Sequence, residues 1–227
     1  MSIRLFLSPL IFILISFLLI ALVPNKKIKI VATSLVFNDS KYEFQDELIT
    51  IYPNETAVLI IDPWDIVEEP RGEIIDGYKN KVANNIGLVL SPALKKFREI
   101  NLKILVASYV SFDLVDERIL NNENINLAFI NEGYGIQKQV DLFNAYLKKN
   151  NINTIIYAGY SADGCLLSRP IGALRMLDEV DRVIVLKDSI VAKEYDYTID
   201  KELMKEISIN MIEKHANGYS TYSKEFF

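Results

Sequence analysis

Short apolar runs rich in β-branched residues alternate with segments of helical periodicity from residue 57 onward, and this alternation restricts the fold more than any other feature. A continuous apolar run indicates a strand covered on both faces, whereas apolar residues three and four apart indicate the inner face of a helix. Strands joined by helices form right-handed crossovers within a parallel sheet, so the sequence predicts an α/β fold. The predicted strands are 57–61, 103–109, 154–158 and 182–186, and the predicted helices are 76–100, 140–149, 172–177 and 201–215.

Composition narrows the class of protein. The chain has 227 residues, of which 50% are hydrophobic, so one domain can bury a full core. The net charge is -5, and Lys and Arg are scattered among acids, which argues against nucleic acid as a partner. A single Cys excludes an intrachain disulfide, and His215 is the one His, so a zinc site built from protein ligands is not expected. We predict no metal and no cofactor.

The first 25 residues are a separate segment. Residues 5–23 carry no charge and approach the length that crosses the hydrocarbon core of a membrane. A cleaved signal peptide would have a shorter apolar region and small residues at the cleavage site, whereas this run ends in Leu22-Val23-Pro24-Asn25. A single-pass transmembrane helix is therefore favoured, with a cleaved signal peptide as the alternative. Basic residues flank both ends, so the side on which the domain lies stays open.

Residues 26–55 alternate apolar and polar positions and are expected to form a linker with extended segments. The folded domain is then 56–227. Three polar positions follow its predicted strands, namely Asp62, the segment 159–165 and Asp188. Ligands of open α/β sheets bind at the carboxyl ends of the strands, so these positions are the candidate site.

Cys165 is the main candidate for chemistry. It follows a strand and a Gly-containing loop and precedes a segment of helical character, where backbone N–H groups favour a thiolate and an oxyanion. A lone Cys is also commonly a small buried apolar residue, and that alternative stays open. Asp62 falls at the same predicted sheet edge and could accept the thiol proton; alone, it would be a residue that caps the following turn. Asp62 and Cys165 together are a more specific indication of a catalytic site than either residue alone.

Two motifs resemble the isochorismatase-like cysteine hydrolase superfamily: Thr56-Ala-Val-Leu-Ile-Ile-Asp62 and Tyr157-Ala-Gly-Tyr-Ser-Ala-Asp-Gly-Cys165. The resemblance extends from Thr56 to the C-terminus. It implies a three-layer Rossmann-like sheet with helices on both faces and an Asp, Lys and Cys triad. Members of the superfamily act on amides such as nicotinamide, on carbamoyl compounds or on isochorismate.

Carried over to this chain, the resemblance makes Asp62 the base and Cys165 the nucleophile. It places a cis peptide bond at Tyr160–Ser161, with the N–H groups of Ser161 and Cys165 as oxyanion donors. The family Lys falls on Asn131, which has no charge and so puts ordinary triad chemistry in doubt.

Trp64 would lie near the pocket, as a wall for an apolar substrate or as packing for its own loop. The metal-binding Asp/His set of the nicotinamidase branch has no His from which to be built, which disfavours a nicotinamidase. The family also implies a homo-oligomer.

The favoured interpretation is a membrane-anchored cysteine hydrolase that acts on a small amide, carbamoyl or related compound through a covalent acyl-enzyme. An inactive relative that keeps the fold for small-molecule binding or assembly is the second interpretation, because of Asn131. A structural domain with a buried Cys165 is the third.

Overall fold

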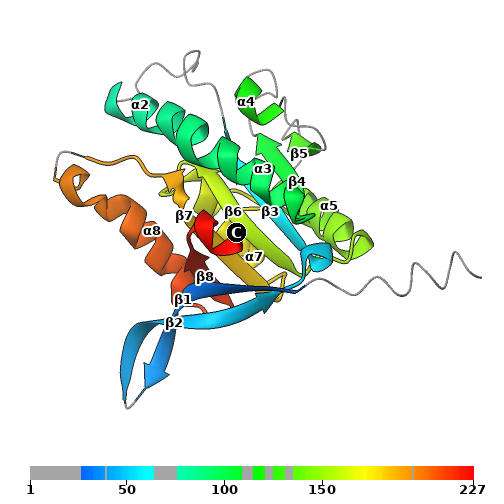
Figure 1. Ribbon diagram of the computed structural model, residues 1–227, viewed down its shortest axis with the longest axis horizontal. Helices are drawn as coiled ribbons and strands as arrows, with labels where there is room; N and C mark the ends of the chain where they lie inside the picture. The colour runs from blue at the N-terminus through cyan, green and yellow to red at the C-terminus, as the bar shows by residue number, and fades with distance from the viewer. Residues whose placement is uncertain are drawn as a thin grey trace, which may run out of the picture.

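The computed structural model describes residues 27–38, 40–63, 76–108, 115–120, 125–130, 135–195 and 197–227, and Figure 1 shows their arrangement. The strands are β1 (Ile28–Asn38), β2 (Lys41–Ile51), β3 (Thr56–Ile61), β4 (Lys103–Ser108), β5 (Ile125–Ile130), β6 (Thr154–Tyr160), β7 (Arg182–Val191) and β8 (Gly218–Thr221). The α-helices are α2 (Asp76–Asn85), α3 (Ser91–Glu99), α4 (Glu117–Leu120), α5 (Ile136–Lys149), α6 (Cys165–Ser168), α7 (Ala173–Met176) and α8 (Leu203–Glu213). A π-helical segment (Ile86–Leu90) joins α2 to α3, and short 3-10 helices are Pro53–Glu55, Ile199–Lys201 and Ser223–Phe226.

All eight strands belong to one sheet, in the order β2-β1-β8-β7-β6-β3-β4-β5. The six strands from β3 to β8 are mutually parallel, and β1 pairs antiparallel with β2 and with β8. Numbered along the chain, the parallel strands have the doubly wound order 3-2-1-4-5-6. The order reverses between β3 and β6, which are the strands that precede Asp62 and the Cys165 loop. That reversal is where ligands bind in such sheets.

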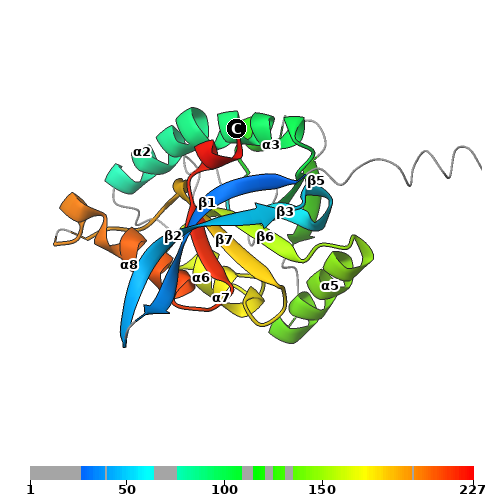
Figure 2. The same ribbon diagram turned by 60° about the horizontal axis from the view of Figure 1, so that its bottom comes forward.

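Helices cover both faces of the sheet, as Figure 2 shows, with α2 and α3 on one side and α5, α6 and α7 on the other. Successive residues along a strand point to opposite faces of the sheet, so their side chains pack alternately against the two helical layers. Val58 and Ile60 join the apolar cluster under α2 and α3, whereas Leu59 and Ile61 join the cluster under α5 to α8. Because both faces are buried, β3 is apolar at nearly every position, and the predicted three-layer α/β architecture is confirmed.

The four predicted strands and four predicted helical regions are all present, with differences at their ends. The helix expected over 76–100 is α2, the π-helical segment and α3 in succession. β7 extends to Val191, so Asp188 lies within this strand and not after it as predicted. Two strands were not predicted, β5 with Asn126 as its second residue and β8 with the sequence GYST. β8 has no continuous apolar run, and the polar Asn126 leaves β5 with a run of only four apolar residues, 127–130.

Residues 28–51 form a hairpin of two 11-residue strands, within the segment expected as a linker with extended parts. Its base joins the core through Ile30, Ala32, Ile49 and Ile51. Among the described residues, no helix is both long and apolar enough to cross a membrane. The predicted transmembrane segment, residues 5–23, lies outside the described residues.

Candidate active site at the reversal of strand order

Asp62 lies at the end of β3 and is 2% exposed. Its φ angle is +46°, a left-handed conformation that Asp adopts more readily than most side chains. Its N–H donates to the Ala107 carbonyl (2.8 Å), which extends the pairing of β3 with β4 by one residue. The carboxylate of Asp62 is therefore buried at the end of β3, at the edge where the strand order of the sheet reverses.

Gly159 allows β6 to approach β3 at this edge. It lies opposite Ile61 and has φ +111°. A Cβ atom at this position would lie 2.1 Å from the Ile61 carbonyl oxygen and 2.7 Å from the Ile61 nitrogen. Only Gly fits here, because the atoms that a side chain would meet are backbone atoms of the neighbouring strand. The end of β6 is thereby held beside Asp62.

The Tyr160–Ser161 peptide bond is cis, at the place that the family resemblance implied. The Tyr160 ring packs in the cluster under α2 and α3, where its hydroxyl donates to Asn85 Oδ1 (2.8 Å). Asn85 in turn donates to the Asp188 carbonyl (2.7 Å). Burial raises the pKa of Tyr160 far above its ordinary value, so the hydroxyl stays protonated. The side chain of Tyr160 thus anchors the strand end on the α2 side of the sheet.

A tight loop leads from Ser161 to Cys165. The N–H groups of Gly164 and Leu166 both donate to the Ser161 carbonyl (3.2 and 3.1 Å). Asp163 Oδ1 accepts from the Lys193 N–H (2.8 Å), which ties the loop to the segment that follows β7. Cys165 is the first residue of α6, and the loop fixes the direction in which its thiol points.

The thiol of Cys165 lies among the side chains of Asp62 and Arg169. Burial raises the pKa of the thiol, and the negative charge of Asp62 raises it further. The positive charge of Arg169 lowers the pKa, and the side-chain hydrogen bonds to the two residues act in the same opposed directions. Arg169 Nε is 3.9 Å from Asp62 Oδ2. A base, a thiol and a cation therefore meet at the edge where the sheet reverses.

The thiolate expected at this position stays a prediction, and burial of the sulfur acts against it. The helix that Cys165 opens has only four residues, and the thiol is largely covered, so loss of solvent raises its pKa. The raised pKa of the thiol favours its neutral form. Formation of the nucleophile then requires transfer of the thiol proton.

Arg169 was not identified from the sequence. It directly follows α6, and its N–H donates to the Cys165 carbonyl (3.2 Å). Residues four apart on a helical turn share a face, so the spacing Cys165 to Arg169 is the signal that could have revealed it. The family resemblance places the expected Lys at Asn131, which carries no charge.

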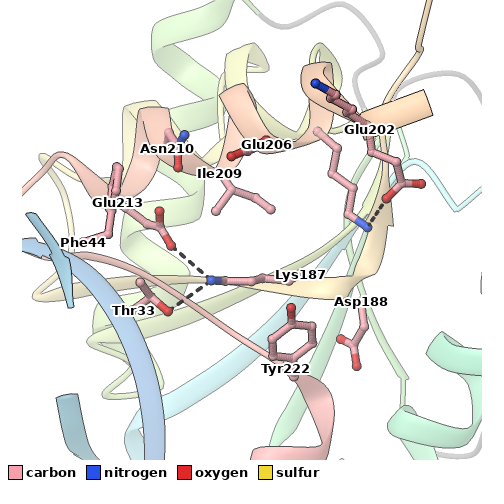
Figure 3. A pocket seen from close by; sticks show the side chains of 12 residues that line it. Thr33, Phe44, Lys187, Asp188, Glu202, Glu206, Ile209, Asn210, Glu213 and Tyr222 are labelled. Carbon is pink, nitrogen blue, oxygen red and sulfur yellow. Dashed lines mark hydrogen bonds and ion pairs between the residues drawn. The ribbon is translucent and has the colours of Figure 1, made fainter. Parts of the chain in front are cut away.

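Asn131 and Trp64 lie outside the described residues, so their predicted roles stay predictions. Asp188 has a structural role, because its carboxylate accepts from the Ser223 N–H (3.1 Å) and Oγ (2.7 Å) and caps the final 3-10 helix. Figure 3 shows Asp188 at a hollow of about 480 Å³ between the hairpin, β7 and α8. Lys187 crosses this hollow to Glu213 (3.5 Å) and Thr33 Oγ1 (3.1 Å). These contacts pair the buried charges of the hollow with one another.

No family model matches the sequence, and no curated protein matches it significantly. Solved structures do match. A cysteine hydrolase from Pseudomonas syringae pv. phaseolicola aligns with 77% of this chain and 92% of its own, at 17% identity and a TM-score of 0.51.

Two further structures have the same TM-score of 0.51. An isochorismatase-like hydrolase from Alkaliphilus metalliredigens is 18% identical and aligns with 76% of this chain and 94% of its own. The nicotinamidase PncA from Bacillus subtilis is 12% identical and aligns with 74% of this chain and 99% of its own. The chain therefore has the fold that isochorismatase-like cysteine hydrolases share with nicotinamidases.

Proposed function

We propose that the protein is a cysteine hydrolase that cleaves a small amide, carbamoyl or related compound. The observation that carries this proposal is the meeting of Asp62, Cys165 and Arg169 at the strand-order reversal. A thiol becomes a nucleophile when a neighbouring base accepts its proton, and a cation stabilises the charges that result. The hydrolase names of the structural neighbours support the same class of reaction.

In the proposed reaction, the Cys165 proton passes to the Asp62 carboxylate as sulfur bonds to the substrate carbonyl carbon. The N–H groups of Ser161 and Cys165 donate to the negative oxygen of the tetrahedral intermediate. The C–N bond then breaks, and the leaving nitrogen takes the proton from Asp62, which leaves a thioester on Cys165. Asp62 next removes a proton from water as this water attacks the thioester. The carboxylic acid leaves, and the proton returns to the sulfur.

In this proposal Arg169 has the role that the triad Lys has in the isochorismatase-like cysteine hydrolase superfamily. Its positive charge offsets Asp62 before the reaction and stabilises the thiolate while Asp62 is protonated. A planar guanidinium can hydrogen-bond with two groups at once, which suits a position between a carboxylate and a sulfur.

A relative that binds a small molecule without turnover is the second candidate. It is favoured by one observation, the raised pKa of Cys165, because such a thiol holds little thiolate at neutral pH. Anchoring through residues 5–23 is part of both proposals. We also propose that the protein forms a homo-oligomer, since a structurally similar protein from Escherichia coli is an octameric hydrolase of unknown specificity.

A panel of small primary amides and carbamoyl compounds tests the hydrolase proposal, with released ammonia as the readout. We expect turnover that Cys165→Ala abolishes, and a mass increase on Cys165 when the reaction is quenched during turnover. Equal ammonia release by the two proteins would rule out Cys165 as the nucleophile. Binding of a panel compound without any ammonia release would favour the second candidate.

A further inference from the structure

One face of the β1–β2 hairpin carries a row of apolar side chains. Residues directly opposite each other in an antiparallel pair point to the same face, as do residues two apart along each strand. Beyond the polar pair Lys29 with Thr50 at the base, the pairs on this face are Val31 with Leu48, Thr33 with Asp46, Leu35 with Phe44 and Phe37 with Tyr42. Six of these eight side chains are apolar or aromatic. We refer to these four pairs as the apolar hairpin face.

The apolar hairpin face is exposed. Phe37 is 61% accessible, Tyr42 73%, Phe44 48% and Leu48 63%. The rings of Phe37 and Tyr42 contact each other near the turn, with centroids 4.9 Å apart. Exposed apolar groups gathered on one face mark an interaction site more often than scattered ones do.

The other face of the same hairpin is polar beyond its base. Its pairs toward the turn are Ala32 with Glu47, Ser34 with Gln45, Val36 with Glu43 and Asn38 with Lys41. Ser34 Oγ donates to Glu47 (2.8 Å). The hairpin is therefore amphipathic, which a strand pair that faced water on both sides would not need to be.

The charge on the apolar hairpin face is already paired. Its one acid is Asp46, which accepts from Thr33 Oγ1 (2.7 Å). The base of the hairpin is fixed to the domain, because Thr221 Oγ1 donates to the Val31 carbonyl (2.5 Å). Figure 1 shows the hairpin along one margin of the molecule, with its turn projecting beyond α8. Thr33 and Phe44 of this face also line the hollow against β7 and α8, where Lys187 Nζ lies 3.1 Å from Thr33 Oγ1. The part of the face that is free of the hollow is therefore Val31, Leu48 and the end toward the turn.

The sequence that precedes the hairpin indicates what the face meets. The charge-free run of residues 5–23 ends at Val23, and β1 begins at Ile28. Five residue steps span at most about 17 Å. If the run crosses a bilayer as proposed, Ile28 lies within that distance of the bilayer surface. Two 11-residue strands then extend about 35 Å from this point, long enough to lie along the membrane.

A bilayer surface fits this face better than edge pairing with a second copy does. Phe and Tyr rings with an apolar body suit the boundary between acyl chains and headgroups. The free edge of β2 could pair with another β2, but that pairing would extend the sheet and leave the apolar hairpin face uncovered.

We infer that the apolar hairpin face lies against the surface of the membrane in which residues 5–23 are anchored. Contact along the hairpin orients the domain, in addition to the tether. The inference depends on the proposed anchor and not on the proposed hydrolase chemistry.

Fluorescence quenching by brominated lipid tests this contact with a matched pair of variants. The chain has one Trp, Trp64, so Trp64→Phe provides a background without indole. Tyr42→Trp and Glu43→Trp then place an indole at neighbouring positions on opposite faces of the hairpin. The full chain of each is reconstituted into phosphatidylcholine vesicles with and without brominated acyl chains, and flotation of the vesicles reports the anchor.

We expect both variants to float with the vesicles. Brominated lipid should quench the indole at position 42 by about twofold or more and leave the indole at position 43 nearly unchanged, since bromine quenches only groups at the depth of the acyl chains. Equal quenching of the two, or none, would overturn the inference and leave the anchor intact. A blue-shifted but unquenched indole at position 42 would show that protein covers the face, which also overturns it. Failure to float would remove the anchor and this inference together, without bearing on ammonia release.

Discussion

Arg169 Nε lies 3.9 Å from Asp62 Oδ2, and the thiol of Cys165 is subject to both charges. The two charges act on the sulfur in opposite directions. Asp62 disfavours the thiolate while it is negative, and Arg169 favours it. Protonation of Asp62 removes the opposing charge at the moment when the thiolate forms. Substitutions of Asp62 or Arg169 should therefore change the reactivity of the thiol and the rate of turnover separately.

Asp62→Asn should speed alkylation of Cys165 and abolish hydrolysis. Loss of the negative charge lowers the pKa of the thiol toward its ordinary value, so the rate with iodoacetamide at neutral pH should rise by about tenfold. Loss of the base should lower kcat by about a hundredfold or more. Alkylation kinetics and ammonia release measure the two effects. A variant in which both rates fall, or in which turnover persists, would contradict the assignment of Asp62 as the base.

Arg169→Gln should have the reverse effect on the thiol. Without the guanidinium the pKa of Cys165 rises further, and alkylation at about pH 8 should slow by roughly threefold to tenfold. Arg169→Lys keeps the charge and should restore part of the rate. Arg175→Gln is the control, because Arg175 lies in α7 and contacts Gln137 (3.4 Å). Equal rates for Arg169→Gln and Arg175→Gln would exclude an electrostatic role for Arg169.

The alkylation rate of Cys165 should depend steeply on pH. The pKa of the thiol is raised above the ordinary 9.0, chiefly by burial, so the reactive thiolate becomes the main form only above that pH. Iodoacetamide rates measured from about pH 6 to pH 10 should still be rising at the upper end. The same measurement on the unfolded chain should level off earlier. A rate that is already constant near neutral pH would indicate a preformed thiolate.

Gly159→Ala should destabilise the fold strongly. The φ angle of +111° disfavours a side chain, and the new Cβ would meet the backbone of Ile61. We expect a loss of about 3 kcal/mol in the free energy of unfolding. Gly77→Ala in α2 is the matched control, since its Cβ would have no neighbour within 4 Å, and should be neutral or stabilising by up to about 1 kcal/mol. Urea unfolding of both variants checks the difference, and a Gly159→Ala protein as stable as the parent would refute the close contact.

Tyr160→Phe should reduce stability with little effect on turnover. The hydroxyl donates to Asn85 Oδ1 on the α2 side of the sheet, and its removal should cost about 1 kcal/mol. The ring would remain in the same apolar cluster. Urea unfolding and ammonia release provide the two readouts. A tenfold fall in kcat at unchanged stability would instead place the hydroxyl in contact with substrate.

The parallel core could be predicted from sequence because its strands are buried on both faces. The runs that became β3, β4, β6 and β7 are apolar at consecutive positions and buried. β5 and β8 were missed because the first contains Asn126 and the second is short and hydroxyl-rich. Their pairing depends on neighbouring strands that are distant in the sequence, which no local pattern contains.

The sequence by itself determined that Asp62 and Cys165 fall at the same edge of one parallel sheet, since the two motifs and the strand alternation are local features. Only the structure made their strands, β3 and β6, neighbours. The family resemblance also implied the cis bond at Tyr160–Ser161, which the structure contains. Only the tertiary structure decided which cation joins them and what state the thiol has. Arg169 reaches Asp62 because α6 ends there, and the pKa of Cys165 is raised because the fold removes water from the sulfur. Charge proximity and desolvation depend on the whole surroundings of an atom, and those surroundings come from segments far apart in the chain.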